Sequence, residues 1–276
     1  MKFGLHTVFI PRENILFLEE WIVYHMNIGA EAFYLYDNTG STAKDSDAYN
    51  IDNNMARNGK TRWQFNIAEM TKHLTDADIQ VKLNDLATKY PIQYIRWANK
   101  DSKGNIIYDQ YNSCVHCAEN ADADWIAFID IDEFIITDRD SKTPRKITEL
   151  INSWDEQGIK RVFIQQFKMK DRYLHFIETG EASVKNITEA MKMDTKGWAQ
   201  KIILSRKHFL KEVKVRNYWI HLLNIKEGKS YEPDVMEIGF NHYNLNEFTL
   251  KFMESAPDII RRKKEMGVDR VLADRL

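Results

Sequence analysis

One segment, residues 125–136, constrains the fold of this chain more than any other. It reads WIAFIDIDEFII, and such a nearly continuous apolar run is typical of a strand buried on both faces of a parallel sheet. Three acids, Asp130, Asp132 and Glu133, lie toward its carboxyl end. Open α/β sheets bind their ligands at that edge, so we expect a ligand there that offsets the negative charge.

The spacing of the two aspartates suggests what that ligand is. In an extended chain, Asp-x-Asp places both carboxylates on the same side, because strand side chains repeat every second residue. A hard divalent cation takes one or two carboxylates and leaves its other positions to phosphate oxygens and water. A metal–diphosphate site is therefore one interpretation. The other is that the acids cap the following helix or face water, and the motif alone leaves both open.

Length and charge limit the classes of protein. A chain of 276 residues fits one large α/β domain, or one domain with an appendage. The net charge of −2 gives no general indication of nucleic-acid binding. We find neither a secretory signal nor the run of about 18 apolar residues that a membrane span needs, so we expect a cytoplasmic protein. The basic run at residues 261–264 is either a peripheral membrane contact or a solvated helix face.

The two cysteines, Cys114 and Cys117, have the CxxC spacing of redox and zinc sites. No second cysteine pair exists to complete a four-ligand zinc site. Both lie in a segment with a helical pattern, so we expect them to be packing residues.

Strand-like and helical segments alternate in the first half, which predicts a parallel, doubly wound sheet. Gly29 fits a helix C-terminal cap. We expect strands at residues 5–10, 32–36, 125–136 and either 61–65 or 92–97, helices at residues 15–28, 45–59 and 108–121, and a loop at 11–14.

The second half is less regular, and its polar stretch at residues 168–196 is a candidate for substrate-facing loops. We expect a single α/β domain over residues 1–245, with a Rossmann-like, mostly parallel sheet flanked by helices. Its nucleotide-binding half spans residues 1–136 and its acceptor half residues 137–245, and a helical segment follows at 246–276. The expected elements are helices at residues 147–158, 246–255 and 257–266 and strands at 161–167, 201–205 and 218–222.

Two stretches resemble glycosyltransferase family 92 and related bacterial family 2-like enzymes. The first is a helix with Leu-x-Glu-Trp and Tyr-His, followed by a glycine and an aromatic strand that ends Tyr-Asp-Asn. The second is the acidic strand, preceded by Gln110 at the start of a helix. Matching residues are Glu13, Leu18, Glu20, Trp21, His25, Gly29, Tyr34, Tyr36, Asp37, Asn38, Trp125, Ile126, Asp130, Asp132, Glu133 and Phe134.

The resemblance is specific over residues 8–40 and 106–136, weaker at 198–253, where FNHYNLNEFTLKF resembles a family segment, and faint at 138–197. The chain departs from the family at residues 168–171, where a Gly-Ser-rich segment is usual, and at 245–246, where Lys-Ser is usual. The resemblance implies a GT-A fold, a nucleotide-activated sugar as donor, a divalent metal (Mn²⁺ or Mg²⁺) and inversion at the anomeric carbon.

For the metal, we expect Asp132 to be the direct ligand, because it lies further along the strand tip. Asp130 is a second candidate that more readily contacts the ribose or a metal-bound water. Glu133 either orients these groups or contacts the sugar, unless it caps a helix. A third ligand is expected from His221 or, as second choice, His242. For the general base that inverting transfer requires, the candidates are Glu178, Glu181 and Glu189, of which Glu189 best matches the family's pattern, and Glu133.

The nucleotide is expected at the first strand–loop–helix unit. Arg12 and Glu13 lie at the start of the first helix, where backbone amides favour anions. Asp37, next to Asn38, either accepts a hydrogen bond from a uracil imide or caps its own turn. Gln110 and Asp130 complete the expected nucleotide contacts, and the diphosphate charge is assigned to Lys201 or Lys251, both of which are otherwise surface lysines.

The favoured function is a metal-dependent inverting glycosyltransferase that uses a UDP-sugar and a glycan or glycolipid acceptor in surface polysaccharide synthesis. One alternative is a sugar nucleotidyltransferase, which should carry a Gly-rich phosphate loop after the first strand. Residues 11–14 read PREN and do not form one. The other alternative is a degenerate GT-A domain that binds sugar or acts as a scaffold.

Overall fold

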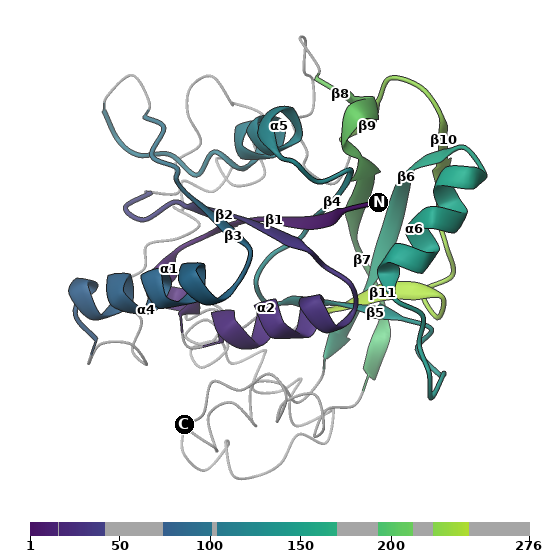
Figure 1. Ribbon diagram of the computed structural model, residues 1–276, viewed down its shortest axis with the longest axis horizontal. Coiled ribbons are helices and arrows are strands. Elements are labelled where there is room, and N and C mark those ends of the chain that lie inside the picture. Colours follow the sequence, from purple (N-terminus) through teal and green to yellow (C-terminus); the bar gives the residue numbers. More distant parts are fainter. Residues whose placement is uncertain (16, 42–73, 101–103, 170–192, 212–222, 243–276) are drawn as a thin grey trace, which may run out of the picture.

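The computed structural model describes residues 1–15, 17–41, 74–100, 104–169, 193–211 and 223–242. Within them, a nine-stranded sheet has the order β3-β2-β1-β4-β7-β6-β11-β5, with β10 (Lys229–Tyr231) paired to β6 (Figure 1). A two-stranded sheet joins β8 (Phe209–Leu210) to β9 (Asn224–Ile225), next to a short 3₁₀ helix, Arg206–His208. The expected α/β class with a mostly parallel central sheet flanked by helices is confirmed.

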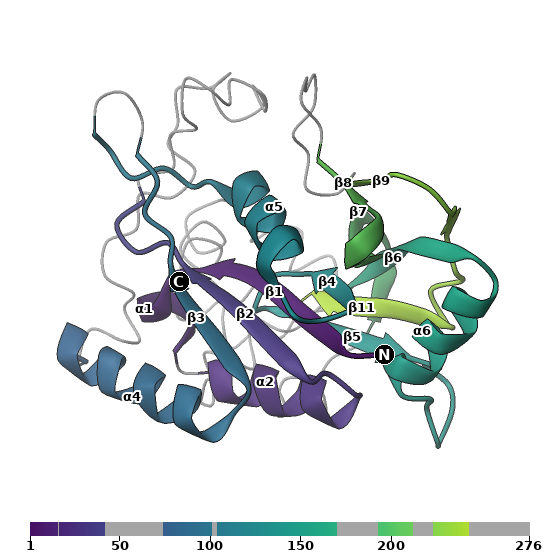
Figure 2. The same cartoon turned by 45° about the horizontal axis from the view of Figure 1, so that its top comes forward.

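The first half of the sheet is parallel throughout. It comprises β1 (Phe3–Phe9), β2 (Ala32–Asp37), β3 (Ile92–Arg96) and β4 (Trp125–Phe128), in the order β3-β2-β1-β4. Helices α2 (Leu18–Asn27) and α4 (Asp76–Lys89) cover one face and α5 (Gln110–Asn120) covers the other (Figure 2). The predicted doubly wound arrangement is confirmed, and residues 92–97 supply its third strand.

The second half of the sheet is mixed. Strand β7 (Met193–Ser205) runs antiparallel to both β4 and β6 (Ile159–Met169), and β11 (Ile238–His242) runs parallel to β6. Strand β5 (Glu133–Thr137) closes this edge antiparallel to β11. These directions bring the ends of β4, β6 and β11 and the start of β5 to one edge of the sheet.

The acidic segment is where the sequence-based expectation was wrong. Residues 125–136 do not form one strand, because the chain turns between β4 and β5, two strands that lie apart in the sheet order. The Glu133 N–H closes this turn on the Asp130 carbonyl at 3.0 Å, and the Glu133 carboxylate accepts the Asp130 N–H at 2.9 Å. The two aspartates therefore do not share one side of an extended chain.

Two apolar clusters hold the layers together. Phe3, Leu5 and Phe9 alternate along β1 and pack with residues of α2, α4 and α6 (Ile147–Glu156), whereas Val8 packs with α5 on the opposite face. Cys114 and Cys117 belong to the second cluster as free, buried thiols. Their prediction as packing residues is confirmed.

Several boundaries differ from expectation. Residues 11–14, predicted as a loop, form the one-turn helix α1 (Pro11–Asn14), with proline at its first position. Gly29 has the left-handed φ of +111° expected of a helix cap, and α6 lies within the predicted helix. Strands β6 and β7 extend into the stretch predicted as loops. The elements predicted at residues 45–59, 61–65, 218–222, 246–255 and 257–266 lie outside the described residues, as does the whole segment 246–276.

None of the described helices is both long enough and apolar enough to cross a membrane.

Candidate functional site

The candidate site is built around the turn at residues 130–133, called the acidic turn below. The turn follows β4 directly and leads into β5 at the carboxyl edge of the parallel strands. Its three acids differ in exposure: the side chain of Asp130 is 35% exposed, that of Asp132 12% and that of Glu133 1%. Asp130 is thus partly exposed, Asp132 is largely buried, and Glu133 is fully buried.

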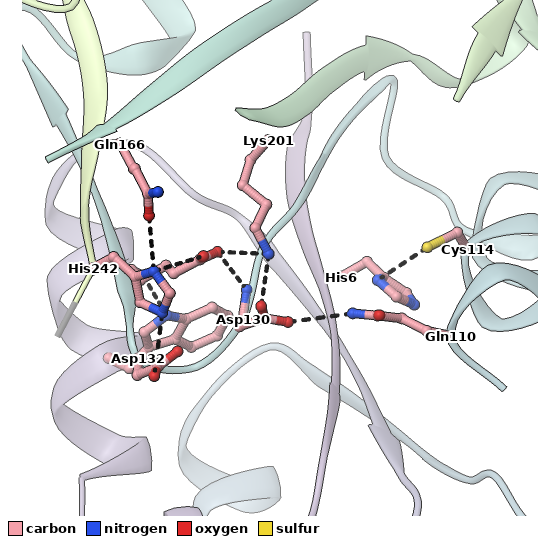
Figure 3. A network of polar contacts seen from close by, with 10 residues as sticks. His6, Gln110, Cys114, Asp130, Asp132, Gln166, Lys201 and His242 are labelled. Carbon is pink, nitrogen blue, oxygen red and sulfur yellow. Dashed lines mark hydrogen bonds and ion pairs between the residues drawn. The ribbon is translucent and has the colours of Figure 1, made fainter. Parts of the chain in front are cut away.

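Lys201 of β7 neutralises part of the acidic turn from below. Its Nζ atom lies 2.6 Å from Asp130 Oδ2 and 3.0 Å from Glu133 Oε2, and its side chain is only 4% exposed (Figure 3). A buried ammonium is stable only when it is paired and hydrogen-bonded, and here both carboxylates meet that need. Lys201 was expected at the diphosphate, but in the structure it supports the acids.

The pKa values of this cluster follow from burial and charge. Burial raises the pKa of Glu133 to about 7, while the Lys201 ammonium acts in the opposite direction. Burial would lower the pKa of Lys201, but Asp130 and Glu133 outweigh it and raise that pKa. Three carboxyl groups gather around one permanent cation and a histidine, an arrangement in which a bound cation would favour the ionised form of the acids.

His242 approaches the acidic turn from the end of β11. Its Nε2 atom lies 3.6 Å from Asp132 Oδ2, and its Nδ1 atom lies 2.9 Å from Gln166 Oε1 and 3.8 Å from Glu133 Oε1 (Figure 3). Burial lowers the pKa of His242, but Asp132 and Glu133 outweigh this effect and raise it. Of the two histidines proposed as metal ligands, His242 lies at the site, and His221 lies outside the described residues.

Asp130 turns away from Asp132 and toward the parallel half of the sheet. Its Oδ1 atom accepts a hydrogen bond from Gln110 Nε2 at 3.3 Å, and its Oδ2 atom faces Lys201 (Figure 3). Gln110 and Asp130, both expected to contact the nucleotide, are therefore neighbours. This orientation favours a ribose or water contact for Asp130 over direct metal ligation.

The other expected nucleotide residues have internal partners. Arg12 donates to the Leu74 carbonyl at 2.9 Å and pairs with Asp76, which ties α1 to the start of α4. Asp37 is 6% exposed and accepts hydrogen bonds from the Thr39 N–H at 2.8 Å and from the Tyr94 hydroxyl. These contacts support the turn-capping reading of Asp37, and its contact with a nucleobase stays a prediction.

Asn38 directly follows β2, and Glu13 lies shortly after the end of β1. The Asn38 amide donates to the carbonyls of Trp97 (2.7 Å) and Ile107 (3.1 Å), so it fastens the end of β2 to the segment before α5. Glu13 lies in α1, directly after β1. Their nucleotide contacts stay predictions.

Of the proposed general bases, only Glu133 lies within the described residues. Glu133 is buried and bonded to the Asp130 amide and Lys201, which favours the orienting role over contact with a sugar. Glu178, Glu181 and Glu189 lie outside the described residues, as does Lys251.

One site residue was missed from the sequence. Gln166 of β6 is 3% exposed and contacts the imidazole of His242. The pair of glutamines at residues 165–166, within the otherwise apolar stretch 162–167, was the available signal.

The described residues suit a divalent cation whose other ligands are substrate phosphates and water. No group of three or more His, Cys, Asp or Glu side chains within them is arranged to hold a metal. Asp132 and His242 converge as a pair, and Mg²⁺-like cations are commonly bound through one or two protein carboxylates plus substrate phosphates and water. The donor set therefore suits a cation that accompanies a diphosphate.

Comparison with known proteins identifies a family for this chain. A model of glycosyltransferase family 92 matches residues 55–272. No curated protein matches the chain.

Solved structures with a similar arrangement include TarS from S. aureus, with 10% identity over 61% of this chain and 22% of TarS, at a TM-score of 0.33. HddC from Yersinia pseudotuberculosis has 11% identity over 96% and 98% of the two chains, at 0.41. Glucosyl-3-phosphoglycerate synthase from Mycobacterium tuberculosis, in complex with Mn²⁺, uridine-diphosphate and phosphoglyceric acid, has 11% identity over 75% and 56%, at 0.32. The chain spans between 22% and 36% of the TarS chains that it matches.

Proposed function

The chain belongs to glycosyltransferase family 92, and on that premise we propose that it transfers a sugar from a nucleotide-sugar, with UDP as the nucleotide, to a glycan or glycolipid acceptor. The observation that carries the proposal is the convergence of Asp132 and His242 at the carboxyl edge of the parallel strands. Asp130 and Gln110 lie beside this pair, toward the parallel half of the sheet. This edge is the general ligand-binding place of open α/β sheets.

In this proposal each residue has a separate task. Asp132 and His242 hold the divalent cation, manganese or magnesium, and Asp130 with Gln110 orients the ribose. The bound cation supplies Lewis-acid stabilisation of the charge that develops on the leaving diphosphate. Lys201 and Glu133 keep the acidic turn in place and stay out of contact with the sugar.

Inversion at the anomeric carbon and the place of the reaction are part of the same proposal. An inverting transfer needs a base within reach of the acceptor hydroxyl, and Glu189 is our candidate for it. We place the reaction in surface polysaccharide synthesis on the cytoplasmic side. The basic run at residues 261–264 is the candidate for a peripheral contact with an anionic membrane.

A donor-hydrolysis screen tests the proposal directly. The protein is incubated with UDP-, GDP- and dTDP-sugars, with and without Mn²⁺, and released nucleoside diphosphate is measured. We expect release from a UDP-sugar that requires the metal. Hydrolysis of no donor, together with binding of no nucleoside diphosphate, would instead favour the scaffold reading. Formation of a nucleotide-sugar from nucleoside triphosphate and sugar phosphate would favour the nucleotidyltransferase.

A further inference from the structure

We propose that Gln166 is a positioning residue: it holds the His242 ring with Nε2 facing Asp132 and thereby sets the affinity of the acidic turn for a divalent cation. This inference rests on the proposed function and deepens it, because it identifies what prepares the site for its metal. Gln166 contacts Nδ1, the ring nitrogen opposite the expected ligand atom, so its effect on the site passes through His242.

The first observation is the contact itself. Strands β6 and β11 are parallel neighbours, and Gln166 Oε1 lies 2.9 Å from His242 Nδ1. Gln166 is 3% exposed. A largely buried contact of this kind restricts the rotation of the ring, because a buried polar group that loses its hydrogen bond destabilises the protein.

The second observation concerns which ring nitrogen carries the proton. Glu133 Oε1 lies 3.8 Å from the same Nδ1 atom, and among the described residues this buried oxygen has no hydrogen-bond donor. Both groups in front of Nδ1 are therefore oxygen acceptors. They stabilise a ring form in which Nδ1 donates. Asp132 Oδ2 lies 3.6 Å from Nε2, so a proton on Nε2 faces this carboxylate while no cation is bound, and a cation held between the two atoms would take the place of that proton.

The third observation is the chemistry of the residue. Histidines that ligate metals usually donate their second ring N–H to a carboxylate, carbonyl or water, which fixes the ring's orientation. A glutamine oxygen fills this role without adding a further negative charge to a turn that already carries three acids. Gln166 thus orients the ring and leaves the charge of the site unchanged.

The test combines two measurements. The first is the dissociation constant of Mn²⁺ in the presence of saturating UDP, read from the electron paramagnetic resonance signal of free Mn²⁺. It compares the wild type with Gln166→Met, which has a similar shape but no oxygen, and with Gln166→Glu, which keeps an acceptor. Gln165→Met is the matched control one position away. The second measurement is the ¹⁵N NMR spectrum of the His242 ring in the metal-free wild type, assigned with His242→Gln.

We expect Gln166→Met to weaken Mn²⁺ binding by about 10- to 100-fold, Gln166→Glu to remain close to the wild type, and Gln165→Met to have no effect. The His242 ring of the metal-free wild type should carry a proton on Nδ1, a result that holds even if Gln166→Met does not fold. Unchanged Mn²⁺ affinity in Gln166→Met, or a His242 ring with no proton on Nδ1, would overturn the inference alone. A wild type that takes up no Mn²⁺ with UDP would overturn the proposed metal dependence and this inference with it.

Discussion

At the scale of the residue, the three acids of one turn have different surroundings and therefore different tasks. Asp132 faces His242, Asp130 faces Lys201 and Gln110, and Glu133 is buried between Lys201 and the backbone of its own turn. A substitution at each position should therefore impair a different property of the protein. Loss of Asp132 should affect chemistry, whereas loss of Lys201 should affect folding.

Asp132→Asn removes one negative charge from the proposed cation site while keeping the shape of the side chain. We expect turnover of the nucleotide-sugar to fall by at least about 100-fold, the size of effect seen when one group that stabilises developing charge is lost. The thermal unfolding midpoint should stay close to that of the wild type. Asp140→Asn, at an exposed position of the following loop, is the control and should keep full activity. Retained activity in Asp132→Asn would overturn the metal assignment.

Lys201→Met removes the buried cation and leaves Glu133, which is 1% exposed, without its ionic partner. Breaking a buried ion pair from one side typically costs about 3–5 kcal/mol, and we expect that loss in the free energy of unfolding from urea titration. Adding Glu133→Gln removes the orphaned charge, so the double variant should regain about 1–3 kcal/mol. Lys207→Met, at an exposed position, should change little. A double variant less stable than Lys201→Met would show that the pairing is not the cause.

At the scale of the element, helix α2 fastens the strand that follows the acidic turn. The Trp21 indole N–H donates to the Glu133 carbonyl at 2.9 Å and the Tyr24 hydroxyl to the Ile135 carbonyl at 2.8 Å. His25 Nε2 accepts the Ile135 N–H at 3.3 Å, while its Nδ1–H donates to the Trp21 carbonyl at 2.8 Å. Trp21 and His25 therefore pack this helix on the sheet.

Through His25, helix α2 should also make the free energy of unfolding depend on pH. Burial lowers the pKa of His25 to about 3, whereas an unfolded histidine binds a proton below about 6.5. The unfolded state therefore takes up more protons, so this contribution to stability is complete above pH 6.5 and is lost as pH falls toward 3. We expect His25→Gln to reduce the pH dependence of the unfolding free energy between pH 6 and pH 4 by about 1.4 kcal/mol per pH unit. Identical slopes for the two proteins would contradict the buried neutral ring.

A separate prediction concerns the two cysteines of helix α5. Both thiols are 1% exposed, and burial raises the pKa of each. Because only an accessible thiolate reacts with alkylating agents, we expect iodoacetamide to modify neither cysteine in the native protein and both after unfolding in urea. Mass spectrometry of the labelled peptides measures this. Rapid labelling of the native protein would show that the thiols are accessible and would contradict the packing of α5 described above.

The sequence was sufficient for the elements whose pattern is local. The apolar run before the acids, the helical spacing of α2 and the glycine that ends it each required no knowledge of distant contacts. The break between β4 and β5 was not predicted, because residues 125–136 are apolar on both sides of the acids. What turns the chain there is a set of contacts with α2 and β7, remote in sequence. The missed role of Gln166 has the same origin, since its partner on β11 lies 76 residues away.

At the scale of the whole molecule, the site forms where the two halves of the sheet meet. The parallel half supplies β4, α5 and the start of the acidic turn, and the mixed half supplies Lys201, Gln166 and His242. Neither half alone holds both the aspartates and the groups that orient them. The match to the family model, over residues 55–272, likewise takes in parts of both halves.

Isothermal titration calorimetry of UDP, with and without Mn²⁺, tests the central claim most directly: that Asp132 and His242 hold a cation together with a nucleoside diphosphate. The account predicts that the wild type binds UDP only when Mn²⁺ is present and that Asp132→Asn loses this binding while staying folded. Equal binding of UDP with and without the metal, or equal metal-dependent binding by Asp132→Asn, would contradict it.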